Sequence, residues 1–378
     1  MHFVDITLFY AAEGGGVSTY LNAKARWLAR HGNFRHTIVS SSVPLRSRQP
    51  DLIRIPGVAV PGVDTFRLPT SVGYPARVLR QLQPDLIEAG DAFHCAWAAL
   101  RAGRRLKVPV VAFYHSDMPQ LIGRRCGHAV ETLARRYLAQ VYRRFDMVLA
   151  PSEMMVRQLH DMGVRDAILQ PLGVDTWTFC PQRRDPSLRE QLRLKPDVRL
   201  LVYAGRFTPE KKLGLLIEAV RRLGKNYHLV LIGSGDELPR SRQVTLIPFQ
   251  REPRLLAQLM ASCDALVHPG DCETFGLVVL EAMACGLPVI GTSAGGVAEL
   301  VNDDTGIRVA PNSVDALCEG ITGLFSRDLS LLGQQARQRA VDQFDWNRIV
   351  PQLLNRYAGL LASQQRAELE ARLSYVAD

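Results

Sequence analysis

Short apolar runs alternate along the chain with longer segments in which apolar residues recur at helical spacing. Continuous runs occupy residues 5–10, 108–115, 200–204 and 227–232, and segments of helical period lie between them. Such runs are typical of strands buried on both faces of a parallel sheet, with helices as the crossovers. Both halves of the chain repeat this order. The pattern predicts an α/β fold of two doubly wound domains.

Residues 268–299 are the most informative segment. They predict a strand end, a tight loop, a helix that starts near Gly276 and a stop at Gly286. Two carboxylates, Glu273 and Glu281, would lie roughly 12 Å apart along eight helical steps. That distance is too long for a carboxylate pair acting on one bond, but it suits two ends of one extended ligand. The free amides of the helix N-terminus lie between them and predict a phosphate site.

Glycines and a histidine follow predicted strands of the first half. The strand at residues 5–10 runs into Ala-Ala-Glu-Gly-Gly-Gly, residues 11–16, and then into a helix. Glycine lets a backbone approach phosphate closely, but this loop lacks the full G-x-G-x-x-G pattern, so an ordinary strand-to-helix turn stays an alternative. His115 ends another buried strand, where open parallel sheets bind ligands. A purely structural histidine is equally consistent with that position.

Cationic residues follow a strand of the second half. Arg206 comes after Gly205 at a strand end, and Lys211 comes five residues later at the start of a helix. An arginine offers planar donors and a lysine a point charge, and a diphosphate uses both. The sequence has no Asp-x-Asp motif, so we expect these cations and helix amides, with no metal or other cofactor, to neutralise a diphosphate.

Composition sets the class of protein. A chain of 378 residues with 47% hydrophobic and 22% charged residues predicts a soluble globular protein of two domains. No apolar run reaches the eighteen residues of a membrane span, and the N-terminus reads as a strand rather than a signal peptide. Seven cysteines without a C-x-x-C pair predict a reduced, cytoplasmic protein without a zinc site.

The positive charge is concentrated in the first half. Residues 1–170 carry 22 Lys and Arg against 13 Asp and Glu, whereas the rest of the chain carries 24 of each. Residues 119–145 are expected to form one long helix with three Arg-Arg pairs. A solvated helix face explains these arginines, and a basic surface that docks on anionic lipid is the alternative. A nucleic-acid-binding module is disfavoured because aromatic content is only 7%.

Taken together, these motifs resemble retaining glycosyltransferases of family 4, which have the GT-B fold. The resemblance spans essentially the whole chain, and its most specific part is the Glu-x7-Glu block. The matching residues are Gly14-Gly15-Gly16-Val17, His115, Pro171-Leu-Gly-Val-Asp175, Gly205-Arg206, Glu210-Lys211, Glu273-Thr-Phe-Gly, Glu281, Gly286-Leu-Pro-Val and Gly295-Gly296-Val-x-Glu299. Residues 113–119 and 268–283 further resemble the bacterial α-mannosyltransferase and sulfoquinovosyltransferase branch, whose members build glycolipids.

The resemblance implies a domain plan and roles for individual residues. Residues 1–170 would form an acceptor-binding domain, residues 171–350 a nucleotide-sugar-binding domain facing it across a cleft, and residues 351–378 a helix and tail that cross back. The implied catalytic residues are Arg206, Lys211, His115 and Glu273. The implied donor-binding residues are Gly15, Gly16, Gly233, Thr274, Phe275, Gly276, Leu277 and Glu281, with Glu281 on the ribose hydroxyls.

The resemblance also implies a reaction and its partners. The expected enzyme moves a hexosyl group, with mannose from GDP-mannose as the first choice, to a lipid or glycan acceptor at the inner face of the membrane. A UDP-sugar-dependent transferase is the alternative, because the turn at residues 247–250 lacks the glycine that many relatives have there. A sugar-nucleotide epimerase and a catalytically silent scaffold are more distant alternatives, and the retained Arg206, Lys211 and glutamates argue against both.

Overall fold

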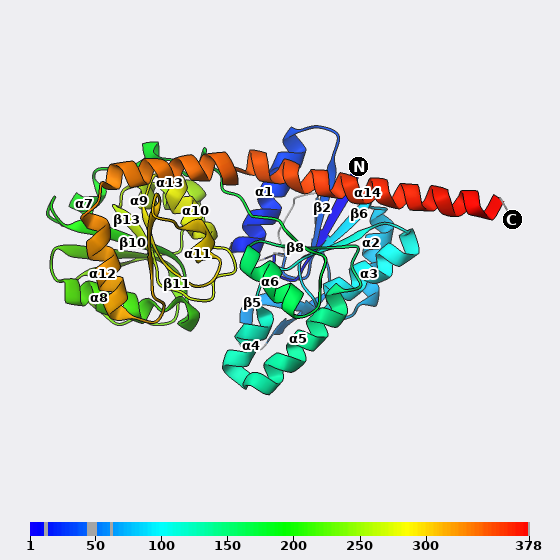
Figure 1. Cartoon of the computed structure of the whole chain (residues 1–378), viewed down its shortest axis with the longest axis horizontal. Coiled ribbons are helices and arrows are strands. Elements are labelled where there is room, and N and C mark those ends of the chain that lie inside the picture. Colours follow the sequence, from blue (N-terminus) through cyan, green and yellow to red (C-terminus); the bar gives the residue numbers. More distant parts are fainter. Residues whose placement is uncertain (11–13, 44–50, 61–62, 377–378) are drawn as a thin grey trace. The chain divides into compact units, whose positions relative to one another are not determined.

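The computed structural model describes residues 1–10, 14–43, 51–60 and 63–376. Contacts within the chain define two compact units, one made of Met1–Pro171 and Trp346–Asp378 and the other of Leu172–Asp345. The last helix therefore belongs to the first unit (Figure 1). Among the described residues, no helix is both long enough and apolar enough to span a membrane.

The first unit is built on a parallel sheet. Its strand order is β3-β2-β1-β6-β7-β8-β9, so the order reverses between β1 and β6. The strands are β1 (His2–Ile6), β2 (Arg35–Ser40), β3 (Leu52–Arg54), β6 (Leu86–Ala89), β7 (Val110–Phe113), β8 (Met147–Ala150) and β9 (Ala167–Leu169). A separate antiparallel pair joins β4 (Gly57–Val60) to β5 (Val63–Pro69).

Helices α2, α3, α5 and α6 pack against one face of this sheet in two adjoining hydrophobic clusters, the first including α2 and α3 and the second including α5 and α6. Val110 of β7 belongs to the first cluster and Ala112 to the second, so both clusters lie on the same face. The helices are α1 (Gly16–Arg30), α2 (Gly73–Leu82), α3 (His94–Leu106), α4 (Met118–Cys126), α5 (His128–Tyr142), α6 (Glu153–Asp161) and α14 (Trp346–Val376). Helix α14 lies along α1, and the Tyr357 ring packs 5.4 Å from the ring of Phe3.

The expectation of one helix over residues 119–145 is wrong. The segment forms a helical hairpin, because Gly127 between α4 and α5 has a φ of 88°, which a right-handed helix cannot contain. The two helices pack closely: a Cβ at Gly123 would lie only 2.5 Å from a carboxylate oxygen of Glu131.

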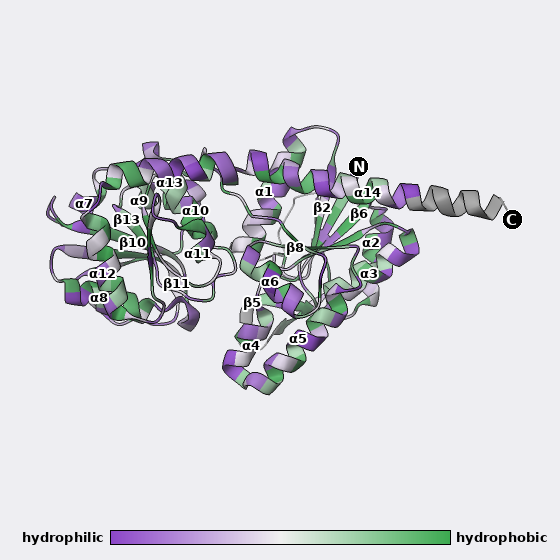
Figure 2. Cartoon of the chain, viewed as in Figure 1, coloured by the Kyte–Doolittle hydropathy of each residue, from purple (hydrophilic) through white to green (hydrophobic). Residues whose placement is uncertain are grey.

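The second unit repeats the architecture with a parallel sheet of order β12-β11-β10-β13-β14-β15, which reverses between β10 and β13. The strands are β10 (Arg199–Phe207), β11 (Tyr227–Gly235), β12 (Val244–Pro248), β13 (Ala265–His268), β14 (Val289–Thr292) and β15 (Gly306–Val309). In each unit the strands are mainly hydrophobic and the helices carry both kinds of residue (Figure 2). This confirms the predicted α/β fold of two doubly wound domains.

The helices of the second unit include α8 and α12, which pack together against the sheet. The helices are α7 (Leu188–Gln191), α8 (Leu213–Leu223), α9 (Pro253–Ala261), α10 (Leu277–Ala284), α11 (Val297–Leu300), α12 (Val314–Phe325) and α13 (Leu329–Phe344), with 3₁₀ turns η1 (Pro181–Arg183) and η2 (Pro209–Lys211). The segment at residues 180–197 thus holds a turn and a short helix.

Candidate active site

Three titratable side chains of the second unit meet where β10 and β13 end. Lys211 closes the turn after β10, His268 is the last residue of β13, and Glu273 lies in the loop that follows. The Lys211 ammonium forms an ion pair with the Glu273 carboxylate, and Nε2 of His268 lies 3.3 Å from Oε2 of that carboxylate. Because the strand order reverses between β10 and β13, this cluster occupies the switch point where open α/β sheets bind ligands.

The charge state of Glu273 follows from these contacts. Burial alone would raise its pKa, but the Lys211 ammonium and His268 outweigh burial and hold the pKa of Glu273 well below its usual range. Tyr203 lies beside this cluster, with its ring 5.8 Å from that of His268 and its hydroxyl donating to the Arg206 carbonyl at 3.2 Å. Burial and the nearby Glu273 raise the pKa of Tyr203, so its hydroxyl stays a neutral donor.

The turn at Gly295 and Gly296 holds the backbone of the Glu273 loop. The Gly296 N–H donates to the Glu273 carbonyl at 2.6 Å. A Cβ at Gly295 would lie 2.8 Å from that carbonyl oxygen, and a Cβ at Gly296 would lie 2.7 Å from Cα of Phe275. Only glycine allows this approach, so the two glycines position the loop rather than simply adding amides.

Helix α10 begins directly after this loop. Its N-cap is Gly276, with a φ of 106°, and its first bond runs from the Val279 N–H to the Gly276 carbonyl at 2.9 Å. The amides of Leu277 and Val278 precede this bond and have no partner within the helix, which is the arrangement by which helix N-termini can bind anions. The Phe275 ring is buried and packs 6.1 Å from Phe344, which leaves only the backbone of Phe275 for a ligand. Thr274 is half-buried in the same loop.

The remaining predicted donor residues of this unit have different settings. Glu281 lies inside α10, and burial raises its pKa to about 8, so it holds a proton at neutral pH. Arg206 is exposed at the end of β10. The neighbouring Gly205 pairs with Gly233 of β11, and a Cβ at Gly233 would lie 1.9 Å from the Gly205 carbonyl oxygen. Gly233 thus allows two strand ends to approach closely next to Arg206.

In the first unit, the glycine loop and His115 also lie at strand ends. Gly15 caps α1 with a φ of 120°, Gly16 is its first residue, and both are exposed. The preceding residues 11–13 of the predicted loop lie outside the described part of the chain. A Cβ at Gly90, after β6, would lie 3.0 Å from Cβ of Thr7, after β1, and 3.6 Å from Cδ2 of His115. His115 therefore lies next to the switch point of the first sheet.

The His115 ring is held by aromatic neighbours. It stacks on Phe113 at a centroid distance of 4.2 Å and a 6° interplanar angle, and it lies 5.4 Å from the Tyr20 ring. Burial lowers the pKa of His115 to about 3. The imidazole is therefore neutral over the physiological range, and it could act as a hydrogen-bonding group but not as a fixed cation.

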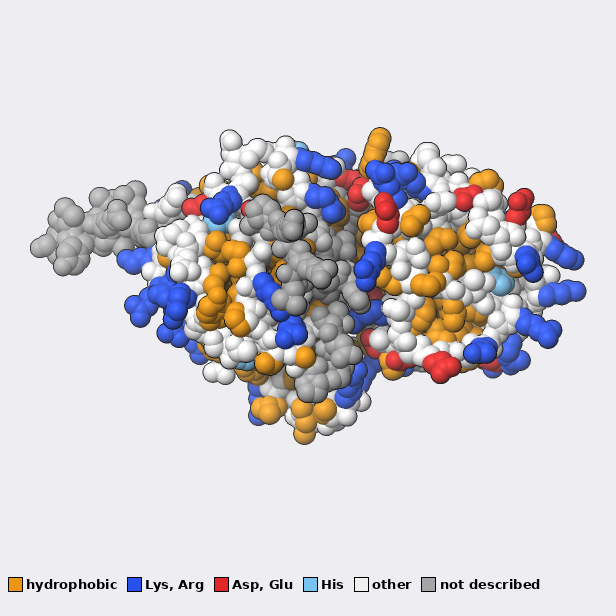
Figure 3. All heavy atoms as spheres, turned by 180° about the vertical axis from the view of Figure 1, so that it is seen from behind, with side chains coloured by type: hydrophobic (Ala, Val, Ile, Leu, Met, Phe, Trp, Pro, Cys, Tyr) orange, Lys and Arg blue, Asp and Glu red, His pale blue; other side chains and the backbone are white. Residues whose placement is uncertain are grey.

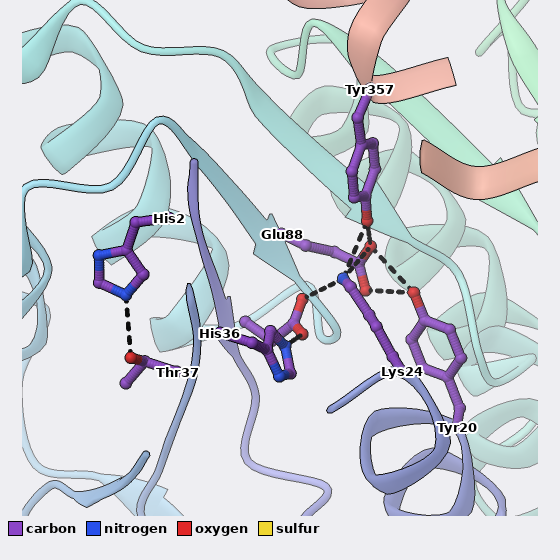
Figure 4. Close-up of polar contacts among 8 residues, drawn as sticks. His2, Tyr20, Lys24, His36, Thr37, Glu88 and Tyr357 are labelled. Carbon is purple, nitrogen blue, oxygen red and sulfur yellow. Dashed lines mark hydrogen bonds and ion pairs between the residues drawn. The ribbon is translucent and has the colours of Figure 1, made fainter. Parts of the chain in front are cut away.

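Figure 4 shows a buried ion cluster around Lys24. Tyr20, which belongs to this cluster, also lies next to the His115 ring. Lys24 is fully buried, with Nζ 2.8 Å from a carboxylate oxygen of Asp5 and 3.3 Å from one of Glu88. The hydroxyls of Tyr20, at 2.9 Å, and of Tyr357 both donate to Glu88. These residues come from β1, α1, β6 and α14, so the cluster ties the last helix to the sheet of the first unit.

The two carboxylates of this cluster differ in protonation. Burial raises the pKa of Glu88 to about 7 despite the nearby ammonium of Lys24. Burial also acts to raise the pKa of Asp5, but Lys24 and the contacting His36 outweigh it and lower that pKa to about 2. One lysine therefore neutralises Asp5, while Glu88 can take up a proton near neutral pH.

Comparison with known proteins places the chain in a family. The family described as "Glycosyltransferase Family 4" matches residues 14–178, and the one described as "Glycosyl transferases group 1" matches residues 185–340. A GDP-mannose-dependent alpha-mannosyltransferase of Corynebacterium glutamicum is 30% identical over 329 residues, which is 84% of this chain and 78% of that protein. The chain belongs to glycosyltransferase family 4. It is a glycosyltransferase, as its sequence motifs predict.

Two further likenesses agree with this family. A GDP-mannose-dependent alpha-(1-6)-phosphatidylinositol dimannoside mannosyltransferase of Mycobacterium tuberculosis is 29% identical and spans 94% of this chain and 95% of that protein. A solved sucrose-phosphate synthase of Thermosynechococcus elongatus matches with a TM-score of 0.79 at 21% identity, over 96% of this chain and 100% of that one. The solved neighbour establishes the GT-B fold of this glycosyltransferase.

The structure brings some predicted site residues of the glycosyltransferase together and adds two others. Lys211 and Glu273 meet directly, although 62 residues separate them in the sequence. His268 and Tyr203 were not predicted as site residues, yet both adjoin this pair. The signal for His268 was its place at the carboxyl end of a buried strand, as for His115. Nothing in the sequence around Tyr203 distinguishes it from a core residue.

Proposed function

We propose that this glycosyltransferase transfers a mannosyl group from GDP-mannose, with retention, to a lipid or glycan acceptor. The observation that carries the proposal is the pair of relatives, 30% and 29% identical, whose names both specify GDP-mannose as donor. Both matches cover more than three quarters of this chain, at 84% and 94%. The name of the second relative supports a phosphatidylinositol-based glycolipid as the acceptor class. A UDP-sugar donor remains the second candidate.

The residues of the second unit would hold the donor in order along its length. Arg206 and Lys211 would bind the diphosphate, with the first amides of α10 beside them. Glu273 and the amides of Phe275 and Gly276 would hold the sugar, and Glu281 would hold the ribose. The Lys211–Glu273 ion pair supports this arrangement, because Lys211 could exchange the carboxylate for phosphate oxygens while Glu273 turns to the sugar hydroxyls. From the first unit, Gly15 and Gly16 would approach the phosphate and His115 the sugar.

The chemistry we propose uses preformed charge and no metal. As the bond to the sugar breaks, negative charge develops on the leaving phosphate, and Arg206, Lys211 and helix amides would stabilise it. Losing one such group costs about 10²–10³-fold in turnover. The leaving phosphate would take the proton of the acceptor hydroxyl as the new bond forms on the same face. Full activity after treatment with EDTA is expected, and a strict requirement for a divalent ion would contradict this part of the proposal.

The donor is identified by a direct screen. Calorimetry with GDP-, UDP- and ADP-sugars, followed by mass spectrometry of products from a lipid extract, should show GDP-mannose as the tightest donor and a mannosylated lipid as the product. Lys211→Ala and Arg206→Ala should each lower turnover by about 10²-fold or more with the fold intact, whereas Lys225→Ala, which removes an exposed lysine of the same unit, should not. Near-native transfer by the first two variants would remove both residues from the mechanism.

We also propose that the α4–α5 hairpin docks on an anionic membrane surface. Leu133 is 67% exposed, and Leu121 and Val130 are also exposed. Figure 3 shows hydrophobic side chains beside Lys and Arg at the tip that α4 and α5 form. Exposed apolar residues framed by arginines suit the headgroup region of a bilayer. In a sedimentation assay, binding of the chain to vesicles should require anionic lipid, weaken with salt and be lost in Leu133→Asp. Binding that does not depend on lipid charge would contradict this proposal.

A further inference from the structure

A cavity of about 350 Å³ lies in the first unit, apart from the predicted site residues. Its lining consists of Val72, Trp97, Leu100, Arg101, Arg104 and Arg105. All but the first come from α3, so we call it the α3 cavity. None of these residues belongs to the donor site or to the α4–α5 hairpin.

The period of the helix explains why the arginines meet at this cavity. At about 100° per residue, Trp97, Arg101 and Arg104 fall within about 60° of one another on the helix surface. The opposite side of α3 is pressed against the sheet, since a Cβ at Gly103 would lie 2.2 Å from Cγ2 of Val110. The arginine side therefore faces outward, and all three guanidinium groups belong to exposed residues.

The floor of the cavity is apolar and ordered. Leu100 is buried, and Trp97 is half-buried. The indole N–H of Trp97 donates to the Tyr137 hydroxyl at 3.2 Å, which in turn donates to the Ala92 carbonyl at 2.9 Å. The Arg144 guanidinium lies 5.2 Å from the centroid of the Trp97 ring. These contacts fix the orientation of the ring and bring a fourth cation close to the cavity.

The three arginines carry charge that the surrounding protein does not neutralise. Within the described part of the chain, no ion pair joins any of them to a carboxylate. Like charges four residues apart on a helix, such as Arg101 and Arg105, repel each other. Cations in the last turn do favour the negative end of the helix, which accounts for Arg104 and Arg105. That effect explains neither Arg101 nor a cavity with an aromatic floor.

We propose that the α3 cavity binds a phosphate ester whose phosphate is attached to a flat or acyl-bearing organic group. Guanidinium forks pair with phosphate oxygens through two parallel hydrogen bonds, and several arginines can share one phosphate. The organic group lies on the floor that Trp97 and Leu100 form. At roughly 30 Å³ per water molecule, the cavity has room for a phosphate and a small organic group. The same chemistry occurs in lipid headgroups and in soluble phosphate esters. The proposal does not depend on the sugar donor.

The test is equilibrium binding by calorimetry on the full chain at about 0.15 M salt, where the Debye length is about 8 Å. The probes are dibutyroyl phosphatidylinositol as a soluble lipid headgroup, phenyl phosphate as a soluble ester, and inorganic phosphate. The cavity variant is Arg101→Gln/Arg104→Gln/Arg105→Gln. The matched control is Arg26→Gln/Arg30→Gln/Arg165→Gln, which removes the same charge from exposed positions of the same unit. Lys211→Ala serves as the donor-site control.

At least one ester should bind about tenfold more tightly than inorganic phosphate, since only the ester contacts the apolar floor. The cavity variant should lose about 100-fold or more, and the two controls should stay within about threefold of the unaltered chain. A preference for the phosphatidylinositol probe would identify a lipid headgroup, and a preference for phenyl phosphate a soluble ester. Equal loss in the charge control, loss in Lys211→Ala, or no gain of either ester over inorganic phosphate would each overturn the proposal.

A second variant keeps the test decisive if the triple variant does not fold. Trp97→Phe retains every charge but removes the indole ring and its hydrogen bond. It should weaken the esters by about threefold to tenfold and leave inorganic phosphate unchanged. It should also abolish the change in tryptophan fluorescence that ester binding produces. Unchanged ester binding together with an unchanged fluorescence response would contradict the proposed floor.

Discussion

Replacing Glu88 by Gln should change how the stability of the first unit depends on pH. Glu88 is 1% exposed, and burial raises its pKa from 4.5 to about 7 in spite of Lys24. Between these two pH values the folded chain binds a proton at Glu88 that the unfolded chain has released. Stability from this group is therefore fully present below pH 4.5 and is lost as the pH rises through about 7.

The size of the effect follows from the shift. A change from 4.5 to about 7, at about 1.4 kcal/mol per pH unit, corresponds to about 3 kcal/mol. His115 acts in the opposite direction, because burial lowers its pKa to about 3 and folding then improves as the pH rises towards 6.5. The two groups partly cancel in the unaltered chain. The informative quantity is thus the difference in unfolding free energy between the unaltered chain and Glu88→Gln.

The assay can be restricted to one unit. Of the four tryptophans, Trp27, Trp97 and Trp346 belong to the first unit, and Trp177 alone belongs to the second, where it is 82% exposed. In a Trp177→Phe background, tryptophan fluorescence during urea unfolding reports the first unit. Between pH 4.5 and 8, the unaltered chain should lose about 3 kcal/mol of unfolding free energy that Glu88→Gln does not lose. Relative to the unaltered chain, the variant therefore becomes more stable as the pH rises.

A control separates this effect from general changes in surface charge. Asp161→Asn removes an exposed carboxylate of the same unit and should leave the pH dependence parallel to that of the unaltered chain. If Glu88→Gln is equally parallel from pH 4.5 to 8, Glu88 does not titrate in this window. The account of the cluster as one neutralised carboxylate beside one protonatable carboxylate would then be refuted.

Three other substitutions test separate features. Lys24→Met should lower the unfolding free energy by about 3–5 kcal/mol in the same fluorescence assay, because it leaves the buried Asp5 carboxylate without its cation. A loss under about 1 kcal/mol would contradict the ion pair. Gly233→Ala should destabilise the second unit by about 1–3 kcal/mol in thermal unfolding followed by circular dichroism, because its Cβ would lie 1.9 Å from a carbonyl oxygen; an unchanged melting temperature would show that the strand ends separate freely. Glu281→Gln should become more stable relative to the unaltered chain as the pH rises from 4.5 through about 8, since burial raises the pKa of Glu281 to about 8; identical pH profiles would argue against its burial.

Much of the fold could be predicted because local and tertiary preferences agree. The apolar runs expected to be strands at residues 200–204 and 227–232 fall within β10 and β11. Both segments are apolar on the faces that become buried and are bounded by residues that stop the element. The prediction of one helix over residues 119–145 failed because the apolar period continues across Gly127, the residue between α4 and α5. One residue in a left-handed conformation reversed the chain, and a helical period cannot report that.

The sequence identified residues of the candidate site, but it did not predict the contacts between them. The motifs identified Lys211 and Glu273, and family resemblance assigned them to different parts of one donor. Their ion pair depends on β10 and β13 being neighbours, which is a property of strand order rather than of spacing. His268 joins them because it ends β13. A local sequence pattern cannot contain such a contact, since the order of strands is decided by the packing of the whole sheet.

The buried ion cluster shows where the sequence did contain a usable signal. Asp5 and Glu88 each lie between apolar residues within a strand, and strands buried on both faces leave a carboxylate no access to water. An ionised carboxylate in that position requires a cation or a proton. The sequence therefore implied a buried partner, but many lysines and arginines could have supplied it. Lys24 was selected by the face that α1 turns to the sheet, and Tyr357 by the return of α14, both of which exist only in the folded unit.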